Sequence, residues 1–210
     1  MRLGLLLAGA CAGDRATAFE AAMSSGRCAE LDWPELRDDC AVFHRQCALV
    51  EGEKAGWECA FRQAEHEGDA AACTKAGAWA DDCRLHVWAA SFEGWAPKGV
   101  RPGEAEAQVA ERLSGFGLAP TDPRPWSAWF RFVHGNSRPL DRAACAAVVD
   151  PMQAEACRQT ALAHYGDMLN VARDRKLYPC DGGPLPAFLQ YTPDPELDAL
   201  RARRADLCPP

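Results

Sequence analysis

Apolar residues recur along most of the chain at the three- and four-residue spacing that marks one face of an α-helix. The first clear run steps from Leu36 through Cys40, Phe43 and Cys47 to Val50. Because an α-helix has about 3.6 residues per turn, this spacing keeps all five side chains on one side of a helix. A second run with the same rhythm consists of Cys157, Ala161, His164, Met168 and Val171. Strand-like alternation is hard to find, and the pattern predicts an all-α fold.

The cysteines follow a local repeat. Four segments have two cysteines separated by nine or eleven residues, with a turn or cap residue four to five positions after the first cysteine. These cap residues are Asp32, Gly52, Gly77 and Asp150. Pro34 and Pro151 follow at the first helical position, where the missing N–H group costs nothing. The second cysteine of each segment is therefore expected about two turns into a new helix.

This layout favours a disulfide within each segment. In an antiparallel helical hairpin, a residue just before the turn faces a residue just after it, and each short bridge contributes about 3 kcal/mol to stability. The predicted pairs are Cys28–Cys40, Cys47–Cys59, Cys73–Cys83 and Cys145–Cys157, with Cys180–Cys208 closing the C-terminus.

A nested pairing of Cys28 with Cys59 and of Cys40 with Cys47, as in twin-cysteine helical domains, is the main alternative. The apolar run described above places Cys40 and Cys47 on one continuous helix. Their separation would then be about 10 Å, too far for a bond. We therefore reject the nested pairing.

The cysteine count indicates the compartment. Eleven cysteines in 210 residues point either to disulfides or to metal sites. Zinc knuckles place two thiolates two to four residues apart, whereas the tightest pair here, Cys40 and Cys47, has six residues between. No Cys-x-x-Cys occurs. Disulfides are therefore favoured, and with them an oxidising, extracytoplasmic compartment.

The N-terminus has the features of an export signal. Met1 and Arg2 precede a short apolar run that ends in small residues before a cysteine. The segment Leu7-Ala8-Gly9-Ala10-Cys11 resembles the signal of bacterial lipoproteins, although the usual leucine stands three residues before the cysteine and here stands four before. The resemblance implies a signal peptide at residues 1–10 and a lipid on Cys11, anchoring the protein to a bacterial membrane in the cell envelope.

Two alternatives to lipidation stay open. Ala8-Gly9-Ala10 or Ala10-Cys11-Ala12 also suits an ordinary cleavage site, which would give a periplasmic or secreted soluble protein, and the true translation start could lie upstream. Parity favours the lipid, because setting Cys11 aside leaves an even number of cysteines that can pair completely. No later segment is long and apolar enough to span a bilayer.

Glycine and proline divide the chain. They accumulate between Phe92 and Asp122, around one amphipathic helix expected near 104–113. We expect a cysteine-rich lobe of helical hairpins at 11–93, a connector at 94–122 and a C-terminal helical lobe at 123–210. The last lobe opens with an aromatic stripe that is typical of a core: Trp126, Trp129, Phe130 and Val133.

Motifs for catalysis or cofactor binding are missing. There is no phosphate loop, no Gly-x-Gly-x-x-Gly, no Gly-x-Ser-x-Gly elbow and no His-Glu-x-x-His, so no cofactor is expected. A net charge of −7 argues against nucleic acid as a partner. His86, His134 and His164 are weak candidates for a metal or a base, and a buried, hydrogen-bonded imidazole is the preferred interpretation. His134-Gly135-Asn136 is interpreted as a helix end with Gly135 at positive φ.

These observations favour a non-catalytic, lipid-anchored envelope protein that presents a rigid helical surface to another protein or ligand. Disulfides restrict motion and so lower the entropy cost of binding. The competing hypothesis is a secreted hydrolase or metal-binding protein in which two of the three candidate histidines meet beside Asp or Glu residues. A purely structural spacer is the third possibility.

Overall fold

The protein is all-α. A computed structural model describes the backbone of residues 8–208 and the side chains from Asp14 onward. The predicted signal peptide at 1–10 lies mostly outside this range, and so does the side chain of Cys11. Within the described range there are eight α-helices, seven short 3₁₀ helices and no β-strand. The all-α prediction is confirmed.

The chain forms two compact units, 1–87 and 88–210. The boundary falls inside α4 (Ala80–Trp95), six residues before the end of the predicted N-terminal lobe. The predicted connector at 94–122 is not a separate linker, because it belongs to the second unit and supplies buried side chains to it. These buried connector residues are Val100, Ala105, Val109, Leu113 and Leu118.

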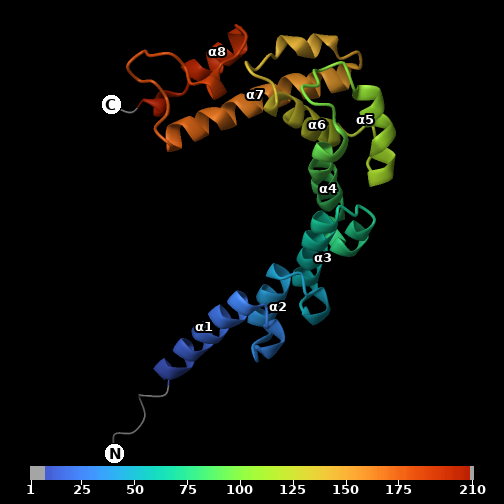
Figure 1. The fold of residues 1–210 in the computed structure, drawn as a ribbon, viewed down its shortest axis with the longest axis vertical. Helices are drawn as coiled ribbons and strands as arrows, with labels where there is room; N and C mark the ends of the chain where they lie inside the picture. Colours follow the sequence, from blue (N-terminus) through green and yellow to red (C-terminus); the bar gives the residue numbers. More distant parts are fainter. Residues whose placement is uncertain (1–7, 209–210) are drawn as a thin grey trace, which may run out of the picture. The chain divides into compact units, whose positions relative to one another are not determined.

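The first unit is built from stapled turns and helices. Its α-helices are α1 (Ala8–Ser25), α2 (Pro34–Phe43), α3 (Glu53–Glu67) and the first part of α4. Its 3₁₀ helices are η1 (Cys28–Glu30), η2 (Cys47–Leu49) and η3 (Ala72–Trp79). Figure 1 labels the α-helices along the chain.

A cysteine in a 3₁₀ helix begins each stapled segment. In three segments an extended stretch follows, and the second cysteine is the seventh residue of the next α-helix, as in α2, α3 and α7 (Pro151–Asp174). Pro34 and Pro151 occupy the predicted first helical position. The repeat in the cysteine spacing is therefore a repeat of backbone structure.

The five disulfides join the pairs expected from the sequence. Their S–S distances run from 1.95 to 2.08 Å and their Cα–Cα distances from 5.4 to 5.8 Å. The bonds are Cys28–Cys40, Cys47–Cys59, Cys73–Cys83, Cys145–Cys157 and Cys180–Cys208.

The predicted continuous helix through Cys40 and Cys47 is wrong. α2 ends at Phe43, and Arg45 takes a left-handed conformation with φ of 57°. The N–H group of Gln46 then donates to Ala41 O at 2.8 Å, which closes the helix end. Cys47 starts a new turn, and Phe43 is 55% exposed instead of lying on a buried seam.

The second unit is organised around the long helix α7, along which α6 (Pro123–Gly135) packs (Figure 1). The remaining α-helices are α5 (Glu106–Leu113), α8 (Pro195–Ala202) and the second part of α4. The 3₁₀ helices are η4 (Ser114–Phe116), η5 (Ala143–Ala147), η6 (Ala187–Leu189) and η7 (Ala205–Leu207).

The buried face of α7 drifts away from the predicted stripe. Cys157 and Ala161 are fully buried as expected, but Tyr165 and not His164 continues the buried face, and Val171 is 42% exposed. The reason is the helical period, because a strict alternation of three- and four-residue steps slips around a straight helix by about 20° per heptad. Over the two heptads from Cys157 to Val171 the slip is about 40°, which turns the end of the predicted stripe toward solvent.

The predicted aromatic stripe of α6 is core. Trp126, Trp129, Phe130 and Val133 are all 0% exposed. Trp95 stacks on Trp129 with ring centroids 5.5 Å apart and planes 9° apart. The proposed positive φ at Gly135 is wrong, because this residue is the last of α6 and its φ is not positive.

Candidate functional site

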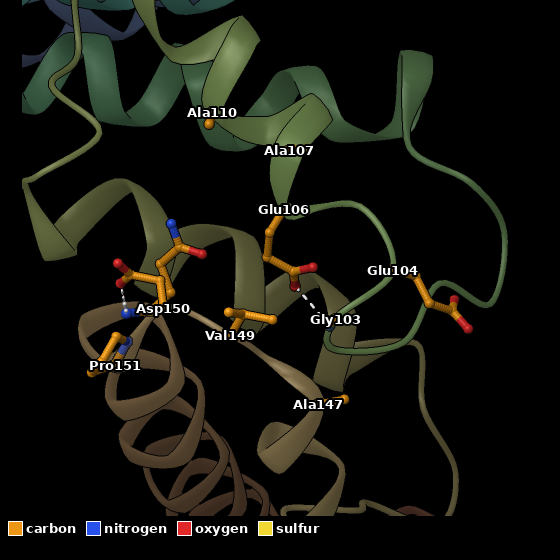
Figure 2. Close-up of a pocket in the computed structure, with 10 residues that line it drawn as sticks. Gly103, Glu104, Glu106, Ala107, Ala110, Ala147, Val149, Asp150 and Pro151 are labelled. Atoms are coloured by element: carbon orange, nitrogen blue, oxygen red, sulfur yellow. Dashed lines mark hydrogen bonds between the residues drawn. The ribbon is translucent and has the colours of Figure 1, made fainter.

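A groove lies between α5 and the start of α7. It encloses about 610 Å³, is open to solvent and is shown in Figure 2. Its lining comes from the middle of the predicted connector, from the last residue of η5, from the link after η5 and from the first turn of α7. The lining residues are Gly103, Glu104, Glu106, Ala107, Ala110, Ala147, Val149, Asp150, Pro151 and Gln153.

The apolar part of this groove is small but highly accessible. Ala107 and Ala110 come from α5 and Ala147 from η5. Val149 is 96% exposed, whereas its neighbour Val148 is 5% exposed. Successive side chains of this extended stretch point in opposite directions, so one valine holds the segment to the core and the other is presented to solvent.

The backbone that carries Val149 is fixed on both sides. The Cys145–Cys157 disulfide closes the loop that contains it, and both cysteines are buried. The Asp150 carboxylate accepts a hydrogen bond from the N–H group of Gln153 at 2.9 Å and so caps α7. An N-cap of this kind stabilises a helix by about 1 kcal/mol. The backbone at Val149 is therefore fixed.

Carboxylates form the rim. Glu104, Glu106 and Asp150 line the groove, and the lining holds no basic residue. Glu104 Oε2 accepts a hydrogen bond from the N–H group of Arg101 at 2.9 Å, and Glu106 Oε1 accepts one from Gly103 at 3.0 Å (Figure 2). These bonds position the carboxylates while each keeps acceptor capacity for a ligand.

Gly103 lets the connector approach η5 closely. Its φ is +93°, and a Cβ atom built there would lie 2.8 Å from Ala147 Cβ and 2.9 Å from Ala147 O. Both the conformation and the contact exclude a side chain. The two walls of the groove are thus joined by direct backbone packing, which fixes its width.

The candidate histidines do not line this groove. His134 lies on α6, is 1% exposed, and its Nε2 is 3.2 Å from Cys157 O. Burial lowers the pKa of this imidazole to about 4, despite the hydrogen bond to Cys157, which favours the charged form. His134 is therefore neutral at pH 7 and donates to the carbonyl, as expected of a buried structural histidine.

The other two candidates differ in their surroundings. His164 on α7 is half-buried, and burial, followed by the positive charges of Arg138 and Arg131, lowers its pKa. His86 belongs to the first unit, is exposed, and its Nδ1 lies 3.2 Å from Glu65 Oε1. His134 and His164 are thus the only two candidates that lie near each other, and they do so where α6 packs against α7.

Two clusters in the described part of the chain have metal-ligand atoms within 4.8 Å of one another. They are Cys28, Cys40 and His44, and His134, Cys145 and Cys157. All four sulfurs are engaged in disulfides, and a disulfide sulfur is not the thiolate that binds a metal. In each cluster the imidazole packs against a disulfide.

Of the groove residues, the sequence singled out only Asp150 and Pro151, and these only as the start of a helix. The only local signal is the pair Val148-Val149 directly before the Asp150-Pro151 helix start. Nothing in that pattern says which valine is buried. The acidic wall comes from residues more than forty positions earlier, and only the folded chain brings the two parts together.

Comparison with known proteins identifies no relative. No protein family, no curated protein and no solved structure matches the chain. Function must therefore be inferred from the chain's own geometry.

The disulfides indicate where the chain folds. Five of them suggest an oxidising environment reached by export. Among residues 8–208, no helix has the length and apolar character needed to cross a membrane.

Proposed function

We propose that this chain is a non-catalytic cell-envelope protein that presents a rigid surface to another protein, and that the groove between α5 and α7 is this surface. The observation that carries the proposal is Val149, which is 96% exposed on a backbone locked by a disulfide and a helix cap. Covering such a side chain contributes about 1.5 kcal/mol or more. Because the loop is already ordered, little of that gain is lost to ordering.

The groove chemistry defines the partner segment. Three carboxylates around an alanine floor favour a segment that combines lysine or arginine with a small apolar side chain. The charged rim is solvent-exposed, so its contribution decreases as salt screens it.

The buried histidine favours this role over that of a secreted hydrolase or metal-binding protein. The competing hypothesis requires two histidines that meet where a substrate can reach them, whereas His134 is 1% exposed and donates to Cys157 O, and the exposed His86 belongs to the other unit.

A peptide titration tests the groove. The probe is a short fluorescent peptide of leucine and lysine, and its control is the same peptide with glutamate in place of lysine. We expect the lysine peptide to bind the full chain with an affinity that falls as salt is added. Val149→Asp should abolish binding, and Phe43→Asp should leave it unchanged, because Phe43 is 55% exposed in the other unit. Equal binding of both peptides, or binding that survives Val149→Asp, would contradict the proposal.

Export and lipid anchoring form the second part of the proposal. The apolar run before Cys11 and the five disulfides support it. Radiolabelled palmitate should enter the wild-type chain in a bacterial host and should not enter Cys11→Ser. A mature chain that begins at another residue and carries no acyl group would refute the anchor and leave a periplasmic or secreted soluble protein.

A further inference from the structure

The second unit exposes apolar side chains at both ends of α7. Among its described residues, the exposed large hydrophobics are Val149, next to the start of α7, and Val171 and Leu177, at its end. Val171 is 42% and Leu177 46% exposed. The helix is 24 residues long, about 36 Å at 1.5 Å per residue, so the two ends of one copy cannot touch.

The two ends of α7 also carry opposite charge. The groove has three carboxylates and no basic residue in its lining. The segment 171–177 holds Arg173, Arg175 and Lys176 against Asp174, a net charge of +2. Arg173 pairs with Asp174 and with Asp206, both at 2.8 Å. Arg175 and Lys176 are exposed and extend this basic end into solvent.

The basic end is as rigidly built as the groove. Lys176 has a left-handed backbone with φ of 54°, its N–H group donates to Arg173 O at 3.0 Å, and that of Leu177 donates to Ala172 O at 2.7 Å. These two bonds form a Schellman motif, which usually has glycine at the left-handed position. A lysine there costs about 1 kcal/mol relative to glycine. It also places a cation beside Leu177, in a direction set by the backbone.

We propose that the groove receives the basic end of α7 from a second copy of this chain, so that copies associate head to tail. This inference rests on the proposed function of the groove and names its partner. Leu177 of one copy covers Val149 and the alanine floor of the next, and Lys176 and Arg175 face the carboxylate rim. The two contacting surfaces differ, so the contact is heterologous, and a dimer keeps one free groove and one free basic end at which further copies can add.

Sedimentation equilibrium tests this association with the full, disulfide-bonded chain. Cys11→Ser is present in every sample, so that acyl chains do not drive assembly. We expect the average mass of the otherwise wild-type chain to rise with concentration, and the rise to weaken with salt. Val149→Asp removes the groove surface and Arg175→Glu with Lys176→Glu removes the basic end, so each variant alone should stay monomeric.

Mixing the two variants gives the decisive result. Val149→Asp keeps an intact basic end, and the Arg175→Glu, Lys176→Glu variant keeps an intact groove. An equal mixture of the two should therefore form 1:1 dimers that do not grow further. Phe43→Asp, in the first unit, should associate like the wild type. Near-ultraviolet circular dichroism checks that each variant keeps its native packing.

Two outcomes overturn the inference. One is a chain that stays monomeric at all concentrations and salts, and the other is a mixture that forms no dimer although both variants are folded. If the lysine–leucine peptide still binds in either case, the groove serves a different basic protein and only the self-association is refuted. If the peptide also fails to bind, the proposed function fails with it.

Discussion

The carboxylate of Asp38 in α2 binds the backbone of Glu51 and Gly52, directly before α3 begins at Glu53. Its two oxygens accept hydrogen bonds from the N–H groups of Glu51 at 2.9 Å and Gly52 at 2.8 Å. Gly52 has no side chain to cap its own helix, and a Cβ atom there would lie 2.7 Å from Asp38 Oδ2. One stapled segment therefore holds the backbone that leads into the helix of the next.

The following pair of segments uses the same repeat position. Asp38 stands two residues before Cys40, and Trp57 stands two residues before Cys59. The ring of Trp57 lies against Gly77, where a Cβ atom would be 2.3 Å from it. A polar contact in one repeat is replaced by an aromatic contact in the next, between the same two positions of the repeat.

Removing this contact should destabilise the first unit. Asp38→Ala removes a buried carboxylate that accepts two part-buried hydrogen bonds from the backbone, and we expect the free energy of unfolding to fall by about 1–3 kcal/mol. Urea unfolding followed by far-ultraviolet circular dichroism measures this change. Asp39→Ala is the matched control, because the neighbouring carboxylate is exposed and its removal should change stability by less than about 0.5 kcal/mol. Equal effects of the two substitutions would contradict this role of Asp38.

Two glycines should respond oppositely to alanine. Gly77 has φ of +55° and packs on Trp57, so Gly77→Ala combines backbone strain with a clash and should cost about 2 kcal/mol or more. Gly56 lies inside α3 with nothing within 4 Å of its Cβ position, so Gly56→Ala should raise stability by about 0.5–1 kcal/mol. Thermal melts of both variants provide the comparison. A stable Gly77→Ala would mean that Trp57 does not pack as described.

The disulfide beside the groove should affect both stability and binding. The residues of Cys145–Cys157 are 12 positions apart, and replacing both by alanine should cost about 3 kcal/mol. It should also weaken binding of the lysine–leucine peptide, because Val149 is no longer held. Replacing Cys73 and Cys83 should cost a similar stability and leave peptide binding unchanged, since that bond lies in the other unit. Equal binding by both variants would refute the locking role.

The buried His134 should make stability depend on pH between 6.5 and about 4. Burial lowers the pKa of this imidazole from the ordinary 6.5 to about 4, so in that window the unfolded chain binds a proton that the folded chain does not. The contribution of the neutral His134 to the free energy of unfolding is therefore complete above pH 6.5. It decreases as the pH falls toward 4, by about 1 kcal/mol per pH unit.

Urea unfolding at a series of pH values measures this dependence. His134→Gln, which keeps an N–H donor for Cys157 O, should flatten it. Some dependence should persist, because burial also lowers the pKa of His164. His86→Gln, at an exposed position, should match the wild type. A His134→Gln slope equal to that of the wild type would show that this imidazole is accessible to protons in the folded state.

Local sequence determined the stapled segments. The pairing of Cys28 with Cys40 and of Cys145 with Cys157 follows from short spacing around a proline-marked helix start, and both bonds are present in the structure. The burial of the α6 stripe is local in the same sense, because one helical face carries nearly all its apolar residues. These features depend on interactions between residues within a dozen positions of one another, so the local sequence is enough to predict them.

Tertiary structure decided the remainder. Arg45 ends α2 although no glycine marks the spot, and Tyr165 takes the core position that spacing gives to His164. The groove joins a connector at 103–110 to a loop at 147–153, and no local pattern relates them. Which of two adjacent valines points outward, and which carboxylates surround it, depends on packing between segments far apart in the sequence. The staples are therefore encoded locally, whereas the surface they hold in place exists only in the folded chain.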